Sequence, residues 1–354
     1  MSLVPTTIVP LFVPSKSMIP STSISSAPSA SIIDWWASEV YDKHTDGVWS
    51  VRFSPNAAWI ASASFDTTIK LWSAKNGGGA VQMLTNHTDP AYSVDFSPDG
   101  TKLVSGGYGA YRPIILWHIN DDGAVLFNKF PMIHTSSVIV VKFSPDGQLI
   151  ASGSMDKTIK VWSVNDGGRL LYNLEGHTKS IYSLSFSVDS KVIASASDDG
   201  SIKLWDIENG GTEIESYIEH TNGVRSVDFS ADGTLLASGS WDVTVKIWSY
   251  KDSALSLVRT MVGHDRNVQS VKFRPDGKYL ASASGSSIRL WNRNDDYYLI
   301  KTLREYTSSI YSIDFSPDGQ KLLSGSADST IRIWWKSSWC HHFFHRLPRL
   351  QHSF

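Results

Sequence analysis

The sequence predicts an all-β fold in which seven copies of one four-stranded antiparallel sheet close into a ring. Seven tryptophans recur at intervals of 43 or 45 residues: Trp72, Trp117, Trp162, Trp205, Trp248, Trp291 and Trp334. A phenylalanine keeps step with them, and a histidine stands nine residues before it in every copy but the last, which has Tyr306. A repeat of this length is a supersecondary unit that cannot bury its apolar faces alone, so the copies must stack.

Each repeat contains short apolar runs separated by turn residues, as the third copy illustrates. After His134 it reads VIVVKF (138–143), SPDG (144–147), QLIASGS (148–154), KTIKVW (157–162) and RLLYNLEGH (169–177). The apolar runs are rich in β-branched residues and too short for helices, so they predict strands. The Pro and Gly of SPDG suit a tight turn between antiparallel strands. Seven such sheets in a ring would cover each other's faces and leave only short edges.

The first predicted strand of the chain belongs with the last repeat. The seventh repeat ends at Trp334, after only its third strand. The segment IIDWWASEVYDKH (32–44) holds the same place before the first histidine that RLLYNLEGH holds before the fourth. We therefore expect residues 32–43 to supply the missing outer strand and close the ring. This divides the chain into a flexible Ser/Pro-rich tail (1–31), the repeat domain (32–335) and a C-terminal tail (336–354).

Composition indicates an ordinary globular protein. The chain has 354 residues, 41% of them hydrophobic, and 34 acidic side chains nearly cancel 32 basic ones. No long-range positive field exists to attract nucleic acid, so we predict no direct nucleic-acid binding. One cysteine, Cys340, fits a reducing compartment, and we expect a cytoplasmic location with the nucleus as the alternative. Residues 1–31 lack a basic leader and are broken by prolines, which predicts neither a secretory signal nor a membrane span.

The C-terminal tail holds the one concentration of metal-binding residue types. Cys340 is followed by His341, His342, His345 and His352. Their spacing does not make a closed tetrahedral set, so we predict no metal site. An aromatic-basic docking segment or a membrane-surface contact stays open as an alternative to an unspecialised tail.

The repeat resembles the WD-repeat (tryptophan–aspartate repeat) β-propeller family over roughly residues 32–335. The resemblance rests on the histidine near the repeat start, the LASGS-type strands, the turn aspartate and the tryptophan six residues later. Only Trp205-Asp206 keeps the Trp-Asp pair itself. The resemblance implies a seven-bladed β-propeller of four-stranded antiparallel blades, closed by an N-terminal strand.

The resemblance also implies a buried hydrogen-bond chain in each blade, from tryptophan through serine and histidine to aspartate. In blades one, three, four and five these residues are His44, Ser62, Asp66, Trp72; His134, Ser152, Asp156, Trp162; His177, Ser195, Asp199, Trp205; and His220, Ser238, Asp242, Trp248. A hydrolase triad is the alternative for a Ser/His/Asp set. The set recurs in several blades and lacks a nucleophile elbow, so we interpret it as structural.

Three blades are expected to lack the complete set. Blade two carries the insertion YGAYR (108–112) in place of the aspartate, and blade six has Gly285 there. Blade seven keeps Ser324, Asp328 and Trp334 but has Tyr306 for the histidine. These turns are either weak points of the fold or sites reshaped for a partner.

We find no catalytic motif, so we predict no enzyme activity, no catalytic residue and no cofactor. In the resembled family the usual contact surface, here called the top face, carries the histidine loops and the turns between second and third strands. We predict that partners bind there through the residues five past each histidine position and those before the turn aspartates. The first set is Trp49, Tyr92, Ile139, Tyr182, Arg225, Gln269 and Tyr311, and the second is Phe65, Met155, Asp198, Trp241 and Ala327.

Aromatic residues and arginine dominate interface hot spots, so this set favours protein binding. The predicted function is a non-catalytic scaffold, monomeric within a larger complex, that binds other proteins or peptide segments. The alternative is a substrate-recognition or sensor module in ubiquitin transfer or signalling. Against a ubiquitin-ligase receptor, no Trp-Asp-x-Arg sequence follows any repeat tryptophan.

Overall fold

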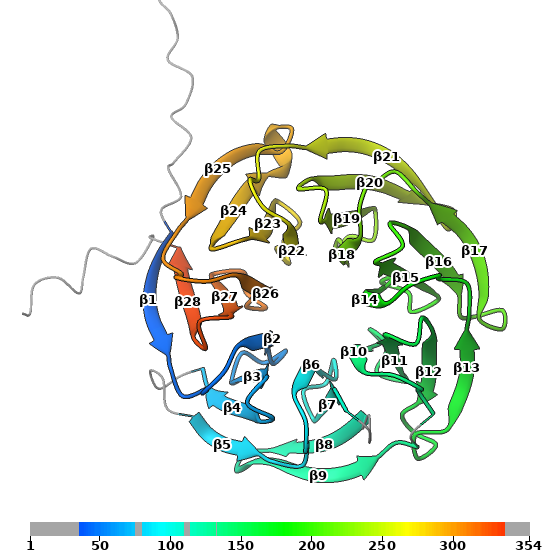
Figure 1. Cartoon of the computed structure of the whole chain (residues 1–354), viewed down its shortest axis with the longest axis vertical. Coiled ribbons are helices and arrows are strands. Elements are labelled where there is room, and N and C mark those ends of the chain that lie inside the picture. Colours follow the sequence, from blue (N-terminus) through cyan, green and yellow to red (C-terminus); the bar gives the residue numbers. More distant parts are fainter. Residues whose placement is uncertain (1–34, 75–79, 110–113, 132, 337–354) are drawn as a thin grey trace, which may run out of the picture. The chain divides into compact units, whose positions relative to one another are not determined.

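The computed structural model describes residues 35–74, 80–109, 114–131 and 133–336. They form seven four-stranded antiparallel sheets arranged as the blades of a ring (Figure 1). Blade one is β2–β5, and blades two to six follow in chain order up to β25. Blade seven combines β26, β27 and β28 with β1. The predicted seven-bladed propeller is therefore confirmed.

The strands of a blade run in order from the centre of the ring outward. The innermost strands are β2 (Val48–Phe53), β6 (Ala91–Phe96), β10 (Val138–Phe143), β14 (Ile181–Phe186), β18 (Val224–Phe229), β22 (Val268–Phe273) and β26 (Ile310–Phe315). The second strands are β3 (Trp59–Ser64), β7 (Lys102–Gly107), β11 (Leu149–Ser154), β15 (Val192–Ser197), β19 (Leu235–Ser240), β23 (Tyr279–Ser284) and β27 (Lys321–Ser326).

The repeat tryptophans lie on the third strands. These are β4 (Ile69–Ser73), β8 (Ile114–Asn120), β12 (Ile159–Ser163), β16 (Ile202–Asp206), β20 (Val245–Lys251), β24 (Ser287–Asn292) and β28 (Ile331–Lys336). The outer strands are β5 (Ala80–Leu84), β9 (Gly123–Lys129), β13 (Leu170–Leu174), β17 (Thr212–Tyr217), β21 (Ala254–Met261), β25 (Tyr298–Leu303) and β1 (Trp35–Tyr41). One 3₁₀ turn, η1 (Arg293–Asp295), precedes β25.

The ring closes by pairing the first strand with the last, as the sequence predicts. β1 lies beside β28 (Figure 1) and runs antiparallel to it. Tyr41 lies opposite Ile331. Tyr41 is 2% exposed and its ring meets the Trp72 indole edge-on at 5.1 Å. Strand β1 thus connects the seventh blade to the core of the first.

The hydrophobic core lies between blades rather than within one sheet. It consists of seven clusters, and each joins the third-strand side of one blade to the inner strands of the next. One cluster packs Val161 of blade three against Leu184 and Trp205 of blade four. Small residues in the second strands permit this approach, because a Cβ on Gly153 would lie 2.8 Å from the Ile181 side chain. Truncating a buried tryptophan to alanine in such a core costs about 3–5 kcal/mol.

Serine side chains on the innermost strands connect most blades. Six of these serines accept a hydrogen bond from a main-chain N–H of the next blade: Ser50, Ser93, Ser183, Ser226, Ser270 and Ser312. The donor–acceptor distances run from 3.0 Å at Ser226 to 3.3 Å at Ser50. Blade three has Val140 at this position, whose side chain has no acceptor. At this position of the innermost strands, the contact between blades three and four therefore depends on apolar packing alone.

Candidate functional site

In every innermost strand, the residue five positions after the histidine position lies in a β-bulge. In β2 the pairing passes from Val48–Ser64 directly to Ser50–Ala63, which leaves Trp49 unpaired. The same break occurs at Tyr92, Ile139, Tyr182, Arg225, Gln269 and Tyr311. A bulge turns the extra side chain out of the sheet pattern. It therefore directs these seven predicted residues toward the centre of the ring.

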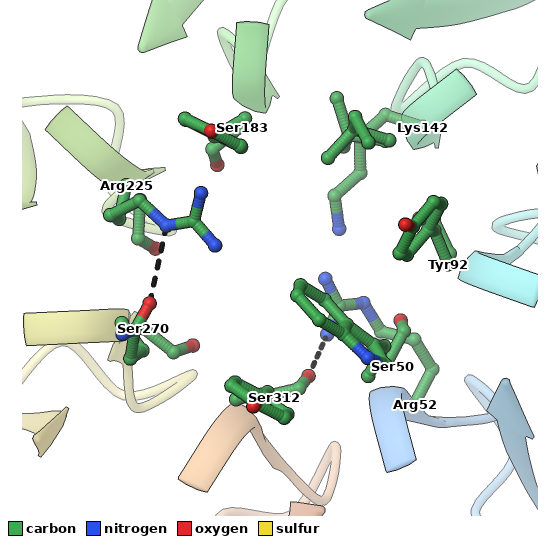
Figure 2. A pocket seen from close by; sticks show the side chains of 16 residues that line it. Ser50, Arg52, Tyr92, Lys142, Ser183, Arg225, Ser270 and Ser312 are labelled. Carbon is green, nitrogen blue, oxygen red and sulfur yellow. Dashed lines mark hydrogen bonds between the residues drawn. The ribbon is translucent and has the colours of Figure 1, made fainter. Parts of the chain in front are cut away.

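These seven side chains line one central pocket together with the residues that follow them on the innermost strands (Figure 2). The pocket has a cavity volume of about 90 Å³, room for a few atoms of a partner side chain rather than for a whole small molecule. All seven blades contribute to its wall. Seven of the twelve predicted binding residues thus converge on a single cavity.

An aromatic cluster occupies one side of the pocket mouth. Trp49 stacks on Tyr311 of blade seven with 4.4 Å between ring centroids and 14° between planes. Trp49 also meets Tyr92 and Phe65, each at 5.1 Å. The indole nitrogen of Trp49 is buried and has no hydrogen-bond partner among the described residues. Burying an unpaired donor costs about 1–3 kcal/mol of stability.

A second cluster lies on blades four and five. The Arg225 guanidinium lies over the Tyr182 ring at 3.6 Å from its centroid, and 5.1 Å from that of Trp241. Its Nε donates a hydrogen bond to Oε1 of Gln269 at 3.2 Å. Cation–π stacking and this bond hold the arginine in one orientation. Tyr182, Arg225 and Trp241 form one contiguous patch at the top of the ring.

The remaining predicted binding residues differ in accessibility. Tyr92 and Ile139 are each only 8% exposed, so they form wall rather than open surface. Phe65, Met155, Asp198, Trp241 and Ala327 are partly exposed in the turns of the top face and do not line the pocket. Asp198 lies 3.7 Å from the ammonium of Lys179.

The hydrogen-bond network has the same geometry in blades one, three, four and five. In blade one, His44 joins Asp66 through Nδ1 and Ser62 through Nε2, each at 2.7 Å. The Trp72 indole N–H donates to the same Ser62 hydroxyl at 2.8 Å. The corresponding distances in the other three blades all lie between 2.7 and 2.9 Å. Four identical copies, each with its histidine buried, are consistent with a structural network.

Electrostatics keeps the network in its charged-aspartate form. Burial acts to raise the pKa of the Asp66 carboxyl, but hydrogen bonds from His44 and Thr68 outweigh it and hold that pKa far below its usual range. Asp156, Asp199 and Asp242 behave in the same way. Burial lowers the pKa of His44 and outweighs the opposing effect of Asp66. The histidine is therefore neutral at pH 7, donating through Nδ1 and accepting at Nε2.

The incomplete blades keep the serine–tryptophan half of the network. His87 and His264 still reach Ser105 and Ser282, but Nδ1 of both rings has no partner among the described residues. Burial, and then the charge of Lys129, lowers the pKa of His87 to about 4. In blade seven the Tyr306 hydroxyl lies 2.7 Å from the Ser324 hydroxyl and replaces the imidazole.

The sequence analysis missed a layer of charged side chains below the pocket mouth. The residue before each repeat phenylalanine is charged in six copies, as Arg52, Asp95, Lys142, Asp228, Lys272 and Asp314, and is Ser185 in blade four. Arg52 and Lys142 line the pocket, and the charges of Asp95, Lys272 and Asp314 act on Lys142, so this layer faces inward. Asp95 pairs with both Arg52 and Lys142, at 3.3 and 3.2 Å, and Lys272 pairs with Asp228 at 2.6 Å. The repeat itself carries the signal for this layer. The position before the phenylalanine lies in a strand whose core is normally apolar, yet its charge changes sign from one copy to the next except at Ser185.

Neither a metal site nor a membrane-spanning helix is present in the part of the chain that the structure describes. No group of three or more His, Cys, Asp or Glu side chains in these residues could hold a metal ion. The Cys340 and histidine group of the C-terminal tail lies outside the described residues. Nor does any helix within these ranges have the length and apolar character needed to cross a membrane.

Known proteins share both the repeat and stretches of this sequence. Part of the chain, 125 residues, is 30% identical to pre-mRNA-processing factor 19 of Bos taurus, covering 35% of this chain and 24% of that protein. A stretch of 123 residues is 28% identical to the transcriptional corepressor LEUNIG_HOMOLOG of Arabidopsis thaliana, covering 35% and 15%. A third relative, protein hir1 of Schizosaccharomyces pombe, is 30% identical over 142 residues, covering 35% and 14%.

These matches span a quarter or less of each relative's length, so they carry the repeat rather than a whole activity. The profile of the family described as "WD domain, G-beta repeat" matches seven times, at 37–73, 78–110, 130–163, 168–206, 211–249, 255–292 and 297–334. Each match includes the third strand of one blade or the turn leading into it. The chain therefore belongs to the WD-repeat family of seven-bladed β-propellers.

Proposed function

We propose that this propeller is a non-catalytic scaffold that binds segments of other proteins on its top face and so assembles a multi-protein complex. The observation that carries the proposal is the convergence of bulged aromatic and arginine side chains on one central pocket. Aromatic residues and arginine supply most binding energy at protein interfaces. A rigid ring presents them with little loss of conformational entropy on binding.

The Ser/His/Asp sets support the non-catalytic part of the proposal. Each serine hydroxyl lies between the tryptophan N–H and the histidine, with the serine 0% exposed in all four complete blades. A nucleophile must reach its substrate, and these hydroxyls are covered by the blade core. Their role here is to hold the turns of the top face in place.

Propellers of this family commonly bind proteins, and two relatives are named as a pre-mRNA-processing factor and a transcriptional corepressor. We propose the same class of partner for this chain, a protein or peptide segment, with the chain itself a monomer inside the complex. The location we propose is the cytoplasm or the nucleus, and the names of those two relatives favour the nucleus.

The experiment is affinity purification with mass spectrometry on the full chain, comparing the wild type with the double variant Trp241→Ala/Arg225→Ala. We expect the main partner to be lost, because removing two hot-spot side chains weakens binding by more than about 2 kcal/mol, or roughly thirtyfold. Thermal melting of both proteins allows binding to be expressed per folded molecule.

The matched control is Phe127→Ala/Arg259→Ala, which removes an aromatic residue and an arginine from outer strands. Phe127 is 55% exposed on β9, and Arg259 lies on β21. Retention of the partner by the control and loss by the top-face variant supports the proposal. The opposite pattern would place the interface on the rim. Binding that survives both changes but fails after removal of 336–354 would place it on the C-terminal tail.

A further inference from the structure

The charged side chains that line the central pocket are all positive, and the carboxylate that pairs with two of them lies in the layer beneath. Figure 2 shows Arg52, Lys142 and Arg225 reaching into the open space from three different blades. They are the charged residues of the described pocket lining, and none of the lining residues is acidic. Field lines converge in a cleft lined by one sign of charge, so the pocket attracts anions.

Counting the neighbouring carboxylates leaves an excess of one positive charge. The inward-facing layer adds one further cation, Lys272, and three carboxylates, Asp95, Asp228 and Asp314. Asp95 is shared between Arg52 and Lys142. Four cationic groups therefore face three carboxylates across the pocket and the layer beneath it.

Arg225 is the cation without a partner of its own. No ion pair joins it to a carboxylate in the described part of the chain, and it is held by the Tyr182 ring and by Gln269. The charge of Asp198 acts on Arg225, but this carboxylate lies 3.7 Å from the Lys179 ammonium and is balanced by it. Because Nε is bound to Gln269, the guanidinium presents its remaining donors to the pocket as a preorganised fork.

Hydroxyl groups complete the lining. Ser50, Ser93 and Ser312 each accept a main-chain N–H from the next blade, which fixes the position of the oxygen. A hydroxyl that accepts such a bond still has its own proton to donate. The wall of the pocket thus combines cations with neutral donors, the combination that binds oxyanions in proteins.

The crowding of positive charges affects the pKa of Lys142. Burial, and then the charge of Arg52, lower the pKa of the Lys142 ammonium to about 8, although Asp95 acts to raise it. Lys272 adds to this effect and Asp314 opposes it. A bound anion would relieve this repulsion.

We propose that the central pocket binds a single carboxylate presented by the partner segment, with Arg225 as its main ligand and Lys142 and the serine hydroxyls as further donors. A carboxylate fits better than a phosphoryl group, because its one negative charge matches the excess of one, whereas a phosphoryl group carries close to two at pH 7. The inference rests on the proposed top-face function and adds the chemistry of the partner.

The test begins with selection of random twelve-residue peptides, displayed on phage, on the immobilised full chain. Each enriched peptide is then synthesised as a pair with Glu and with Gln at the acidic position. We expect one acidic position to be enriched and the Gln peptide to bind about tenfold or more weakly, as for loss of a charge-assisted hydrogen bond. The Glu and Gln peptides should bind the Arg225→Gln variant with equal affinity. The control variant Arg169→Gln, which removes an exposed loop arginine, should keep the full difference in affinity between the two peptides.

Further arms separate the sources of the carboxylate and the ways in which the inference fails. Peptides with a free or an amidated C-terminus distinguish a terminal carboxylate from a side chain, and dependence on either one supports the inference. Peptides whose binding needs Trp241 but no acid would overturn it while leaving the top-face function intact. Tighter binding of the matching phosphoserine peptide would overturn the carboxylate assignment. Failure of Trp241→Ala to reduce capture of any selected peptide would contradict the top-face function itself.

Discussion

Replacing Asp156 by alanine tests whether the repeated Ser/His/Asp sets stabilise the fold. Asp156 accepts four hydrogen bonds: from His134 Nδ1 and the Thr135 N–H at 2.8 Å, the Thr158 N–H at 3.0 Å and the Thr158 hydroxyl at 2.7 Å. The variant leaves all four donors without this acceptor. Thr135 is exposed and can be hydrated, whereas the His134 side chain is 1% exposed and cannot.

The expected loss follows from that single buried donor. Loss of a buried charged acceptor costs about 1–3 kcal/mol, and we expect about 1–2 kcal/mol for Asp156→Ala, because the Thr158 hydroxyl, 3.3 Å from His134 Nδ1, remains as a second partner of that nitrogen. The variant should still fold, because Nδ1 of His87 and of His264 has no partner among the described residues of the wild type. Urea unfolding followed by tryptophan fluorescence measures the change, provided that the slope m stays constant.

The control is Asp121→Ala, which removes an exposed carboxylate from the turn between β8 and β9. A surface change of this kind stays within about 0.5 kcal/mol. A His134→Ala substitution should also cost less in the Asp156→Ala background than in the wild type, since the two side chains share one bond. Equal losses for Asp156→Ala and Asp121→Ala would refute the structural role, and loss of a hydrolytic activity at unchanged stability would revive the enzyme interpretation.

Three further predictions concern ring closure, acid and the seams between blades. Deleting residues 1–28 should leave the melting temperature unchanged, whereas deleting 1–42 should lower it strongly by removing β1 and exposing the edge of β28; equal melting of both truncations would contradict closure by β1. The pKa of each network aspartate is lower in the folded chain than its ordinary value of 3.8. The aspartates therefore contribute fully to the free energy of unfolding above pH 3.8, and this contribution declines as the pH falls below that value. The stability gap between wild type and Asp156→Ala should therefore narrow between pH 5 and about pH 3 in urea unfolding, and a constant gap would show that the carboxylate is not the stabilising form. Ser226→Val should lower the free energy of unfolding by about 1 kcal/mol, because it removes the acceptor of the Val271 N–H, while a valine is tolerated at the equivalent Val140. An unchanged free energy of unfolding would mean that these hydrogen bonds do not stabilise the contacts between blades.

The sequence predicts the architecture well because the repeat states it seven times. The spacing of the tryptophans locates every third strand, and the segment before His44 predicts the closing strand β1. The bulge at Trp49 and its equivalents could not be predicted, since a bulge is a property of pairing between two strands. The stack of Trp49 on Tyr311 joins the first and last blades, so it depends on ring closure and on rotamers that no local pattern encodes. The inward charge layer was readable in principle from the position before each repeat phenylalanine.

Site-specific photo-crosslinking in cells tests the top-face interface most directly. A benzoyl-phenylalanine placed at Met155, in a top-face turn of blade three, should form a covalent adduct with the partner. The same group at Val258, which is 59% exposed on the outer strand β21, should form none. Adducts from Val258 and none from Met155 would contradict the proposal that this propeller binds its partners on the top face.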